Sequence, residues 1–385
     1  MWIMPIKYVW LVDALEGYKR TGLWLLGFDG TKYYPSAAGD DVGIFFFIPL
    51  IAMYLHIDMH TATNIFLLSF LSLSCLVAMV GFYLLFDRVR DRIVALIGLC
   101  IFLLFIFHNA SDVYLIASSA VVAFVPLFLF FLKRKPALLP HYLGIISIPL
   151  ATMHFIRAYS EVGIVIFIII SIFFYLKVSM QRKVLLTGVL LVGFIPTVLF
   201  FTYHLDQRDV FLLRENPDHV FSIRKHGVWQ PFYLGLGYIP NQYGIEFANF
   251  VAIKKVDSIV HGVDITSARF EDIMREEAFA IIKHDPFFYI KTLLAKSRRI
   301  LFFMLITVNV AILSFMHQKK PRAIEIAFLA GILFNSLYGF IAIPTLYYLS
   351  GMIAFGIIYW IVSMPIVLDY IKFPRANSSV SLRKS

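Results

Sequence analysis

The chain has 385 residues, of which 60% are hydrophobic and 15% are charged, and its mean hydropathy is +0.81. Soluble globular proteins hold roughly 45–50% apolar and about 25% charged residues, so this composition predicts an all-α polytopic membrane protein and excludes a cytosolic enzyme and a disordered chain. The formal net charge of +10 does not predict a nucleic-acid partner, because most of the cations stand at the ends of apolar runs, where they set membrane topology.

The first part of the chain, residues 1–63, is predicted to lie outside the membrane. Its first dozen residues are too short to cross about 30 Å of hydrocarbon. Residues 42–57 are apolar, but they number only 16 and contain Pro49. If they crossed the membrane, the segment before them would be cytoplasmic. We prefer an interfacial helix that lies along the outer surface.

Nine apolar runs after residue 63 predict membrane-spanning helices. They cover roughly residues 64–86, 93–108, 113–132, 137–156, 162–178, 184–203, 299–316, 323–346 and 350–371. Alternate connectors carry clusters of Lys and Arg, at 88–92, 133–135, 177–183 and 319–322, whereas the short connectors between them hold only Arg157. The positive-inside rule therefore places the cationic connectors in the cytoplasm and the other connectors outside.

One connector, residues 204–296, contains no apolar run and lies outside by the same parity. Because long loops without structure are uncommon, it is either a small lid domain or a set of interfacial helices. Ser267 can cap a helix whose apolar residues recur at helical spacing, namely Phe270, Ile273, Met274, Ala278 and Ile281. Asp285 can cap the next helix, with Pro286 at its first position.

These observations divide the chain into five parts. They are a first outer loop with interfacial helices (1–63), an N-terminal transmembrane bundle (64–203), an outer or periplasmic loop or lid (204–296), C-terminal transmembrane helices (297–371) and a cytoplasmic tail (372–385).

The middles of the nine predicted spans contain no ionisable residue. Ion-coupled and proton-coupled transporters normally hold such a residue near the midplane of the membrane, so the pattern disfavours a transporter or flippase. The candidate residues Asp112, Arg157 and Glu161 instead stand at the outer ends of spans. This placement favours a site at the outer membrane surface, with substrates that arrive by way of the bilayer.

Carboxylates in two outer connectors are candidate catalytic groups. Asp40 and Asp41 stand side by side in the turn before residues 42–57, and Asp112 stands before a predicted span. A carboxylate there can act as a general base toward a hydroxyl group, or it can hold a divalent cation. A divalent cation is the only cofactor that these residues suggest. The alternative is that Asp40 and Asp112 cap helices, and that Asp41 favours a positive helix end. Both cysteines lie inside apolar runs without metal-ligand spacing.

Cations on the same side are candidate phosphate-binding groups. Arg157 stands at an outer helix end, and Arg224, Lys225 and His226 stand in the long outer loop beside Trp229. Guanidinium groups match the geometry of a phosphate. The alternatives are that Arg157 reaches toward lipid headgroups and that the triplet is ordinary solvated charge.

This arrangement resembles the GT-C superfamily of membrane glycosyltransferases, which includes dolichyl-phosphate-mannose protein mannosyltransferases and aminoarabinose transferases. Those proteins have an acidic residue and interfacial helices in the first outer loop, followed by a span that ends in a basic cytoplasmic turn. Asp40-Asp41, residues 42–57 and residues 87–92 are similar to these features. Asp112 matches an acid in their next outer loop, and residues 276–289 are similar to a segment before a late span in bacterial members.

The chain departs from that superfamily near its start. In similar proteins the principal acid follows the first span and precedes a Tyr, a Leu-rich helix and a Thr-Gly turn, a pattern that residues 8–22 resemble. The position expected to be acidic falls near Met4. Either the chain lacks its N-terminal span and that acid, or Asp40 and Asp41 have taken over the role, or the activity is lost. Asp13 is either a further candidate acid or a plain residue of a helix surface.

The resemblance implies transfer of a sugar from a polyprenyl-phosphate donor to an envelope glycan, lipid or protein acceptor, at the outer face of a bacterial inner (plasma) membrane. It implies that Asp40 or Asp41 takes the proton of the acceptor hydroxyl, while Arg157 with Arg224 or Lys225 stabilises the phosphate leaving group. The expected partners are the lipid-linked sugar, its acceptor and membrane lipids. Rival interpretations are an O-antigen polymerase or ligase that uses lipid-pyrophosphate glycans, a transporter or flippase, and a non-catalytic membrane scaffold.

Overall fold

The computed structural model describes residues 5–36, 41–109, 113–217, 227–317 and 323–372, and these residues are mostly helical. The N-terminal half contains α1 (Pro5–Thr21), β1 (Leu26–Phe28), β2 (Tyr33–Pro35), α2 (Ile44–Leu55), α3 (Met59–Leu85), α4 (Val89–Asn109), α5 (Tyr114–Arg134), η1 (Pro136–Leu138), α6 (Leu139–Ile156), α7 (Val162–Tyr175), α8 (Met180–Val192) and α9 (Ile195–Glu215). The C-terminal half contains α10 (Trp229–Gly235), η2 (Leu236–Tyr238), α11 (Asn249–Asp257), α12 (Ala268–His284), α13 (Pro286–His317), α14 (Ala323–Ile341) and α15 (Ser350–Lys372).

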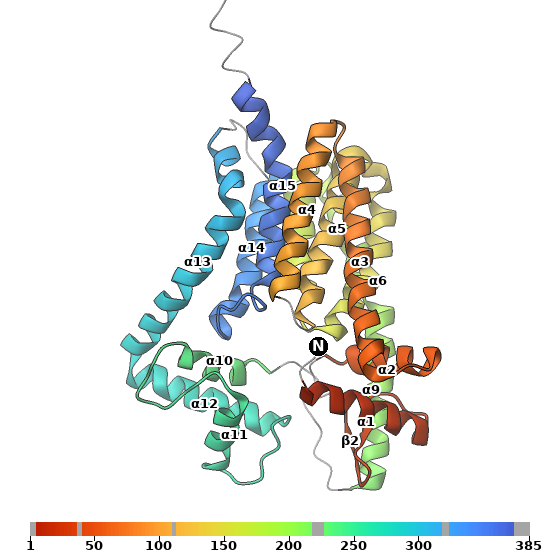
Figure 1. Cartoon of the computed structure of the whole chain (residues 1–385), viewed down its shortest axis with the longest axis vertical. Coiled ribbons are helices and arrows are strands. Elements are labelled where there is room, and N and C mark those ends of the chain that lie inside the picture. The colour runs from red at the N-terminus through yellow and green to blue at the C-terminus, as the bar shows by residue number, and fades with distance from the viewer. Residues whose placement is uncertain (1–4, 37–40, 110–112, 218–226, 318–322, 373–385) are drawn as a thin grey trace, which may run out of the picture.

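Within the described residues, seven helical segments are long and apolar enough to cross a membrane. They are Met59–Leu85, Tyr114–Arg134, Pro136–Ile156, Met180–Glu215, Pro286–Met316, Ala323–Ile341 and Ser350–Ile371. These segments confirm a polytopic helical architecture and agree with seven of the nine predicted spans. The apolar window of α5 is 72% buried and that of α13 only 22%, so α5 lies at the centre of the bundle and α13 at its edge (Figure 1).

The predicted count of nine spans is not confirmed. The run 162–178 forms only the 14 residues of α7, which extend over about 21 Å at 1.5 Å per residue and are short for a bilayer core of about 30 Å. The run 93–108 belongs to α4, which packs against α15 and α3 (Figure 1). Its first turn carries three charged residues, 90–92, which shorten its apolar part.

The segment predicted to be interfacial, residues 42–57, forms the 12-residue helix α2. At about 18 Å this helix is too short to cross a bilayer. Figure 1 shows α2 lying crosswise at one end of the bundle, next to α1 and the β1–β2 hairpin. The architecture therefore agrees with a segment that does not cross, while its depth in a membrane stays a prediction.

The long connector that the sequence predicts to lie outside begins later than residue 204. Helix α9 continues to Glu215, beyond the predicted boundary at residue 203, and Figure 1 shows it extending past the end of the bundle. There the ring of Tyr33 in β2 meets the ring of Phe211 edge-on, with centroids 5.1 Å apart. The end of α9 therefore supports the N-terminal hairpin rather than forming part of a loop.

The rest of the connector forms a small helical unit, α10–α12, with an apolar core of its own. The predicted cap of α12 is confirmed, since the Ser267 hydroxyl accepts a hydrogen bond from the backbone N–H of Phe270 at 3.2 Å. The five predicted apolar residues of α12 are all buried. Asp285 caps α13 as predicted, accepting from the N–H of Phe288 at 2.9 Å.

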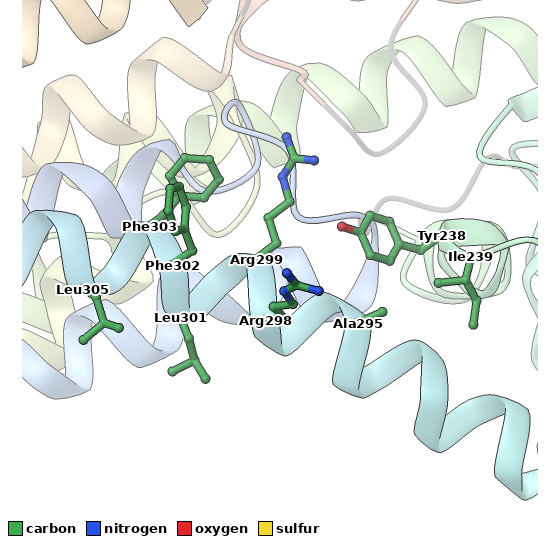
Figure 2. Close-up of a pocket in the computed structure, with 9 residues that line it drawn as sticks. All are labelled: Tyr238, Ile239, Ala295, Arg298, Arg299, Leu301, Phe302, Phe303 and Leu305. Atoms are coloured by element: carbon green, nitrogen blue, oxygen red, sulfur yellow. The ribbon is translucent and has the colours of Figure 1, made fainter.

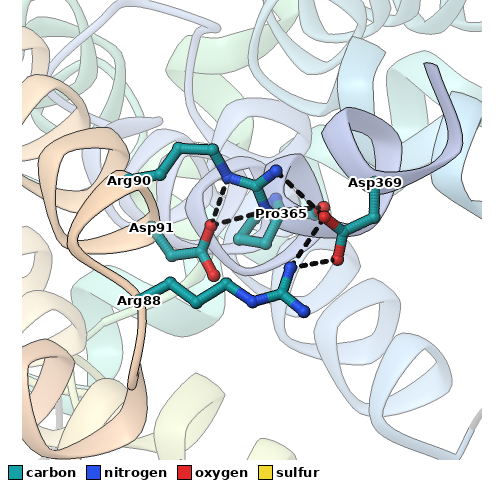
Figure 3. Close-up of polar contacts among 5 residues, drawn as sticks. All are labelled: Arg88, Arg90, Asp91, Pro365 and Asp369. Atoms are coloured by element: carbon teal, nitrogen blue, oxygen red, sulfur yellow. Dashed lines mark hydrogen bonds and ion pairs between the residues drawn. The ribbon is translucent and has the colours of Figure 1, made fainter. Parts of the chain in front are cut away.

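Ion pairs connect helices at the end of the bundle that faces away from α10–α12 (Figure 1). Figure 3 shows Arg88, in the turn between α3 and α4, and Arg90, in the first turn of α4, converging on Asp369 of α15. Their guanidinium nitrogens lie 2.7 and 2.9 Å from the Asp369 carboxylate. Arg134 at the end of α5 pairs with Asp87. Two of the predicted cytoplasmic clusters therefore lie at the end of the bundle that faces away from α10–α12 (Figure 1).

The α10–α12 unit is attached to the bundle where Gly235 meets the C-terminal end of α14. A Cβ atom at Gly235 would lie 2.3 Å from the carbonyl oxygen of Ile341 and 2.5 Å from that of Ala342. The buried ammonium of Lys296, in α13, donates to the carbonyl oxygens of Phe340 and Ala342 at 2.8 and 2.6 Å. This contact has no room for a side chain on α10.

We expect Gly235→Ala to lower the free energy of unfolding by about 1–3 kcal/mol, because the added methyl group forces a shift of the backbone. Gly188→Ala in α8 is the matched control, since no atom lies within 4 Å of its Cβ position. Thermal unfolding in detergent measures both variants. An unchanged melting temperature for Gly235→Ala would contradict this attachment.

Candidate functional site

The turn before α2 places Asp41 in a buried and uncommon position. The residue is 3% exposed, and its φ of +57° lies in the left-handed region, which Asp tolerates better than most residues do. Gly43 fixes the turn against the end of α6, because its N–H donates to the carbonyl of Phe155 at 2.6 Å. A Cβ at Gly43 would lie 2.7 Å from the side chain of Ile156.

Two cations from distant parts of the chain contact the Asp41 carboxylate. Lys7 of α1 donates to Oδ2 at 2.6 Å, and Arg157, at the end of α6, donates to Oδ1 at 3.1 Å. The side chains of Lys7, Arg157 and Asp41 are 19%, 9% and 2% exposed. Such a buried cluster loses stability when one partner is removed, because an uncompensated charge is left behind.

Arg157 extends the cluster toward a group of tyrosines. It donates to the hydroxyl of Tyr114 at 3.1 Å, and its guanidinium lies 4.4 Å from the centre of the Tyr114 ring. The rings of Tyr347 and Tyr348 pack on Tyr114 at 5.2 and 5.0 Å. Burial, followed by the neighbouring Tyr114, raises the pKa of Tyr348 well above its ordinary value, so its hydroxyl stays protonated.

A second acid–base pair lies in the same region of the chain. His154 Nδ1 and Glu161 Oε1 are 2.8 Å apart, and the Glu161 side chain is 6% exposed while that of His154 is 40% exposed. Within the described residues, Glu161 Oε2 has no hydrogen-bond partner. A buried carboxylate that orients a half-exposed imidazole is an arrangement that general bases use.

The structure describes only part of the predicted site. It brings Asp41 and Arg157 into direct contact, but Asp40, Asp112, Arg224, Lys225 and His226 lie outside the described residues. In the sequence, Asp40 adjoins Asp41 and Asp112 stands two residues before Tyr114.

Asp13 holds the hairpin in place. Its carboxylate accepts a hydrogen bond from the hydroxyl of Tyr34 in β2 at 2.5 Å. Burial, and then this hydrogen bond, raise the pKa of Tyr34 above its ordinary value, so Tyr34 remains a donor. Asp13 therefore links α1 to the hairpin, which accounts for a charged residue at this position without a catalytic role.

No group of three His, Cys, Asp or Glu side chains with the geometry of a metal site occurs among the described residues. Asp41 is also a poor cation ligand in this arrangement, because both of its oxygens already contact positive charges. The suggestion of a divalent cation therefore stays a prediction that involves Asp40 and Asp112.

Several residues of the site were not singled out from the sequence. Lys7 and Tyr114 stand in apolar helical stretches, and no local pattern marks them as partners of Asp41 and Arg157. Arg208 and Asp209 form a buried pair in α9, with Arg208 Nε 2.8 Å from Asp209 Oδ1. Because opposite charges close together are common on exposed helix surfaces, the sequence does not indicate that this pair is buried.

No protein-family model, curated protein or solved structure matches this chain. The geometry of the residues themselves is therefore what supports a functional interpretation.

The contacts around Asp41 predict strong coupling between Asp41 and Arg157. Asp41→Asn and Arg157→Gln are each expected to lower the free energy of unfolding by about 3–5 kcal/mol, and the double variant by less than the sum. The exposed pair formed by Glu16 and Arg20, at 2.9 Å, is the control and is expected to contribute about 0.5 kcal/mol or less. Denaturation in mixed detergent measures both cycles, and additive losses at Asp41 and Arg157 would contradict the coupling.

Proposed function

We propose that this protein is a GT-C-type glycosyltransferase. It moves a sugar from a polyprenyl-phosphate donor to an envelope glycan, lipid or protein acceptor at the outer face of a bacterial inner membrane. The observation that carries the proposal is the buried contact of Asp41 with Lys7 and Arg157 at the end of the bundle where α10–α12 also lie. Buried charges in a membrane protein are costly and mark functional sites by default.

The proposed reaction is one displacement at the sugar. The oxygen of the acceptor hydroxyl forms a bond to the anomeric carbon, and the bond from that carbon to the phosphate oxygen breaks. Polyprenyl phosphate leaves with the electron pair, and the hydroxyl proton passes to a base on the protein. Cations close to the leaving phosphate stabilise the charge that develops there.

The described contacts refine the role of Asp41. Because its two oxygens accept from Lys7 and Arg157, a proton taken up by Asp41 would break these ion pairs. Asp41 is therefore suited to hold these cations toward an anionic substrate, whereas Asp40, its neighbour in the sequence, and Asp112 are proposed as proton acceptors.

His154 is a further candidate for the proton acceptor. Its ring is held by the buried Glu161 and remains partly exposed. It lies in the last turn of α6, three residues before Arg157, so it belongs to the same end of the bundle as the Asp41 cluster. An imidazole oriented in this way can take the proton of the acceptor hydroxyl, and the ion pairs of the Asp41 cluster stay intact.

The proposed orientation places α10–α12 outside the cell and the turns near Lys177 inside. We expect a membrane-impermeant thiol reagent to label Ser258→Cys, at the end of α11, in intact cells, because this residue is exposed in the α10–α12 unit. Lys177→Cys, also exposed, should react only after the membrane is opened. Both changes are made with Cys75 and Cys100 replaced by Ala, and labelling of both positions in intact cells would contradict the orientation.

Removing the essential base is expected to lower the rate of sugar transfer about 10²- to 10⁴-fold. We would assay Asp40→Asn, Asp41→Asn, Asp112→Asn and His154→Gln in proteoliposomes with polyprenyl-phosphate donors that carry hexoses or aminopentoses. Release of free polyprenyl phosphate measures the reaction whatever the acceptor is. Asp272→Asn, on the exposed surface of α12, is the control and should retain full activity.

The proposal fails if the wild-type protein releases no polyprenyl phosphate from any of these donors when envelope acceptors are present. The assignment of the site fails if the four variants all retain the wild-type rate while folding normally.

A further inference from the structure

A groove beside α13 has the form of a binding site for a lipid phosphate. We propose that it holds the phosphate of a polyprenyl-phosphate carrier, with the first isoprenoid units of the carrier along the exposed face of α13. This inference rests on the proposed function and says where its lipid substrate binds. The site involves Arg298, Arg299 and Tyr238, none of which belongs to the Asp41 cluster.

The groove lies between α13 and the η2 turn of the α10–α12 unit. It has a volume of about 920 Å³ and is open along one side. Figure 2 shows Tyr238 on one wall and Arg298 and Arg299 on the other. A groove of this size is large enough for a phosphate group and part of a chain.

The two arginines of the groove have no neutralising partner among the residues that the structure describes. Within the described part of the chain, neither Arg298 nor Arg299 forms an ion pair; Arg299 lies only over the ring of Phe303, at 5.9 Å. The hydroxyl of Tyr238 likewise makes no hydrogen bond to a described residue. Two adjacent guanidinium groups and a free hydroxyl favour an anion with several acceptor oxygens, which is the chemistry of a phosphate.

The wall next to the arginines is apolar and faces away from the bundle. Leu301, Phe302 and Leu305 line the groove and are 49%, 58% and 55% exposed. Leu301 follows Arg298 by three residues, or about 4.5 Å along the helix. The cationic end and the apolar face are therefore contiguous, which suits a molecule with a charged head and a hydrocarbon chain better than it suits a free ion.

A rigid segment connects this groove with the Asp41 cluster. Asn241 fixes it by donating to the carbonyls of Ile239 and Ile245 at 3.1 and 2.9 Å and by accepting from the N–H of Ile245 at 3.1 Å. Ile239 lines the groove, while Phe247, at the other end of the segment, packs edge-on against Tyr348 with centroids 6.0 Å apart. The segment 239–247 therefore lines the groove at one end and, at the other, contacts Tyr348, which packs on the Tyr114 that binds Arg157.

Two other buried cations, Arg157 and Lys296, are already engaged by groups of the protein. Arg157 contacts Asp41 and Tyr114, and Lys296 donates to two carbonyl oxygens at the end of α14. A phosphate that approaches from the bilayer can bind Arg298 and Arg299 without breaking a contact within the protein.

The first test is a binding measurement that needs no sugar transfer. The full-length protein in detergent is titrated with polyprenyl phosphate and followed by native mass spectrometry. Arg298→Gln and Arg299→Gln should each raise the dissociation constant about tenfold or more, because each removes a charged hydrogen-bonding group. Arg275→Gln, in an exposed pair with Asp272 on α12, is the charge-matched control and should bind like the wild type. Equal affinity in all variants overturns the proposal.

The second test locates the lipid in the wild-type protein and so does not depend on the folding of a variant. A polyprenyl phosphate with a photoreactive group in its first isoprenoid units should form its adduct on residues 301–305. An adduct confined to another helix overturns the proposal. Inorganic phosphate at equal concentration should not displace the probe, and phosphatidic acid should displace it less well than unlabelled polyprenyl phosphate. Equal displacement by phosphatidic acid overturns the assignment to the carrier.

These outcomes separate the inference from the proposed function. If the adduct and the arginine dependence of binding are observed but no donor is consumed, the binding site in the groove is supported and the glycosyltransferase activity is contradicted. If sugar transfer is observed while binding is unaffected by both arginine variants, the enzyme stands and the groove assignment fails.

Discussion

The arrangement of one end of the helical bundle depends on one buried carboxylate. Asp41 joins α1 and the end of α6 through Lys7 and Arg157. Arg157 also donates a hydrogen bond to the hydroxyl of Tyr114 at the start of α5. The tyrosines of the turn before α15 pack on that ring. Four segments that are far apart in the sequence are therefore fixed around a single negative charge, and the left-handed backbone at Asp41 is maintained because these partners determine its position.

Much of the fold could be predicted from the sequence, because the bilayer sets the minimum length and the apolar composition of each span. Seven apolar runs became long helices, and the caps at Ser267 and Asp285 were found from short local patterns. The failures have a common physical cause, since helix length is decided by contacts as well as by hydropathy. Helix α7 stops after 14 residues, and α9 continues into a polar stretch because Phe211 packs on the hairpin.

The candidate site was predictable only in part. Asp41 and Arg157 were recognised as ionisable residues at outer ends, and they proved to be partners across 116 positions of the sequence. Lys7, Tyr114 and the arginines of the groove carry no comparable signal, because a single cation or tyrosine near a helix end is also typical of an interfacial anchor. Their roles follow from tertiary contacts, which pattern alone does not give. The segment from Ile239 to Phe247 lines the arginine groove at one end and packs on Tyr348, a neighbour of Tyr114, at the other.

The buried contact between Lys296 and the end of α14 affects how the stability of the protein depends on salt concentration. Its ammonium is 2% exposed and is satisfied by backbone carbonyls at a helix C-terminus, with no carboxylate partner among the described residues. Mobile ions screen exposed charge pairs such as Arg134 and Asp87 but hardly reach a desolvated contact of this kind. The joint between the α10–α12 unit and the bundle should therefore keep its strength over a wide range of salt concentrations, unlike a joint made of exposed ion pairs.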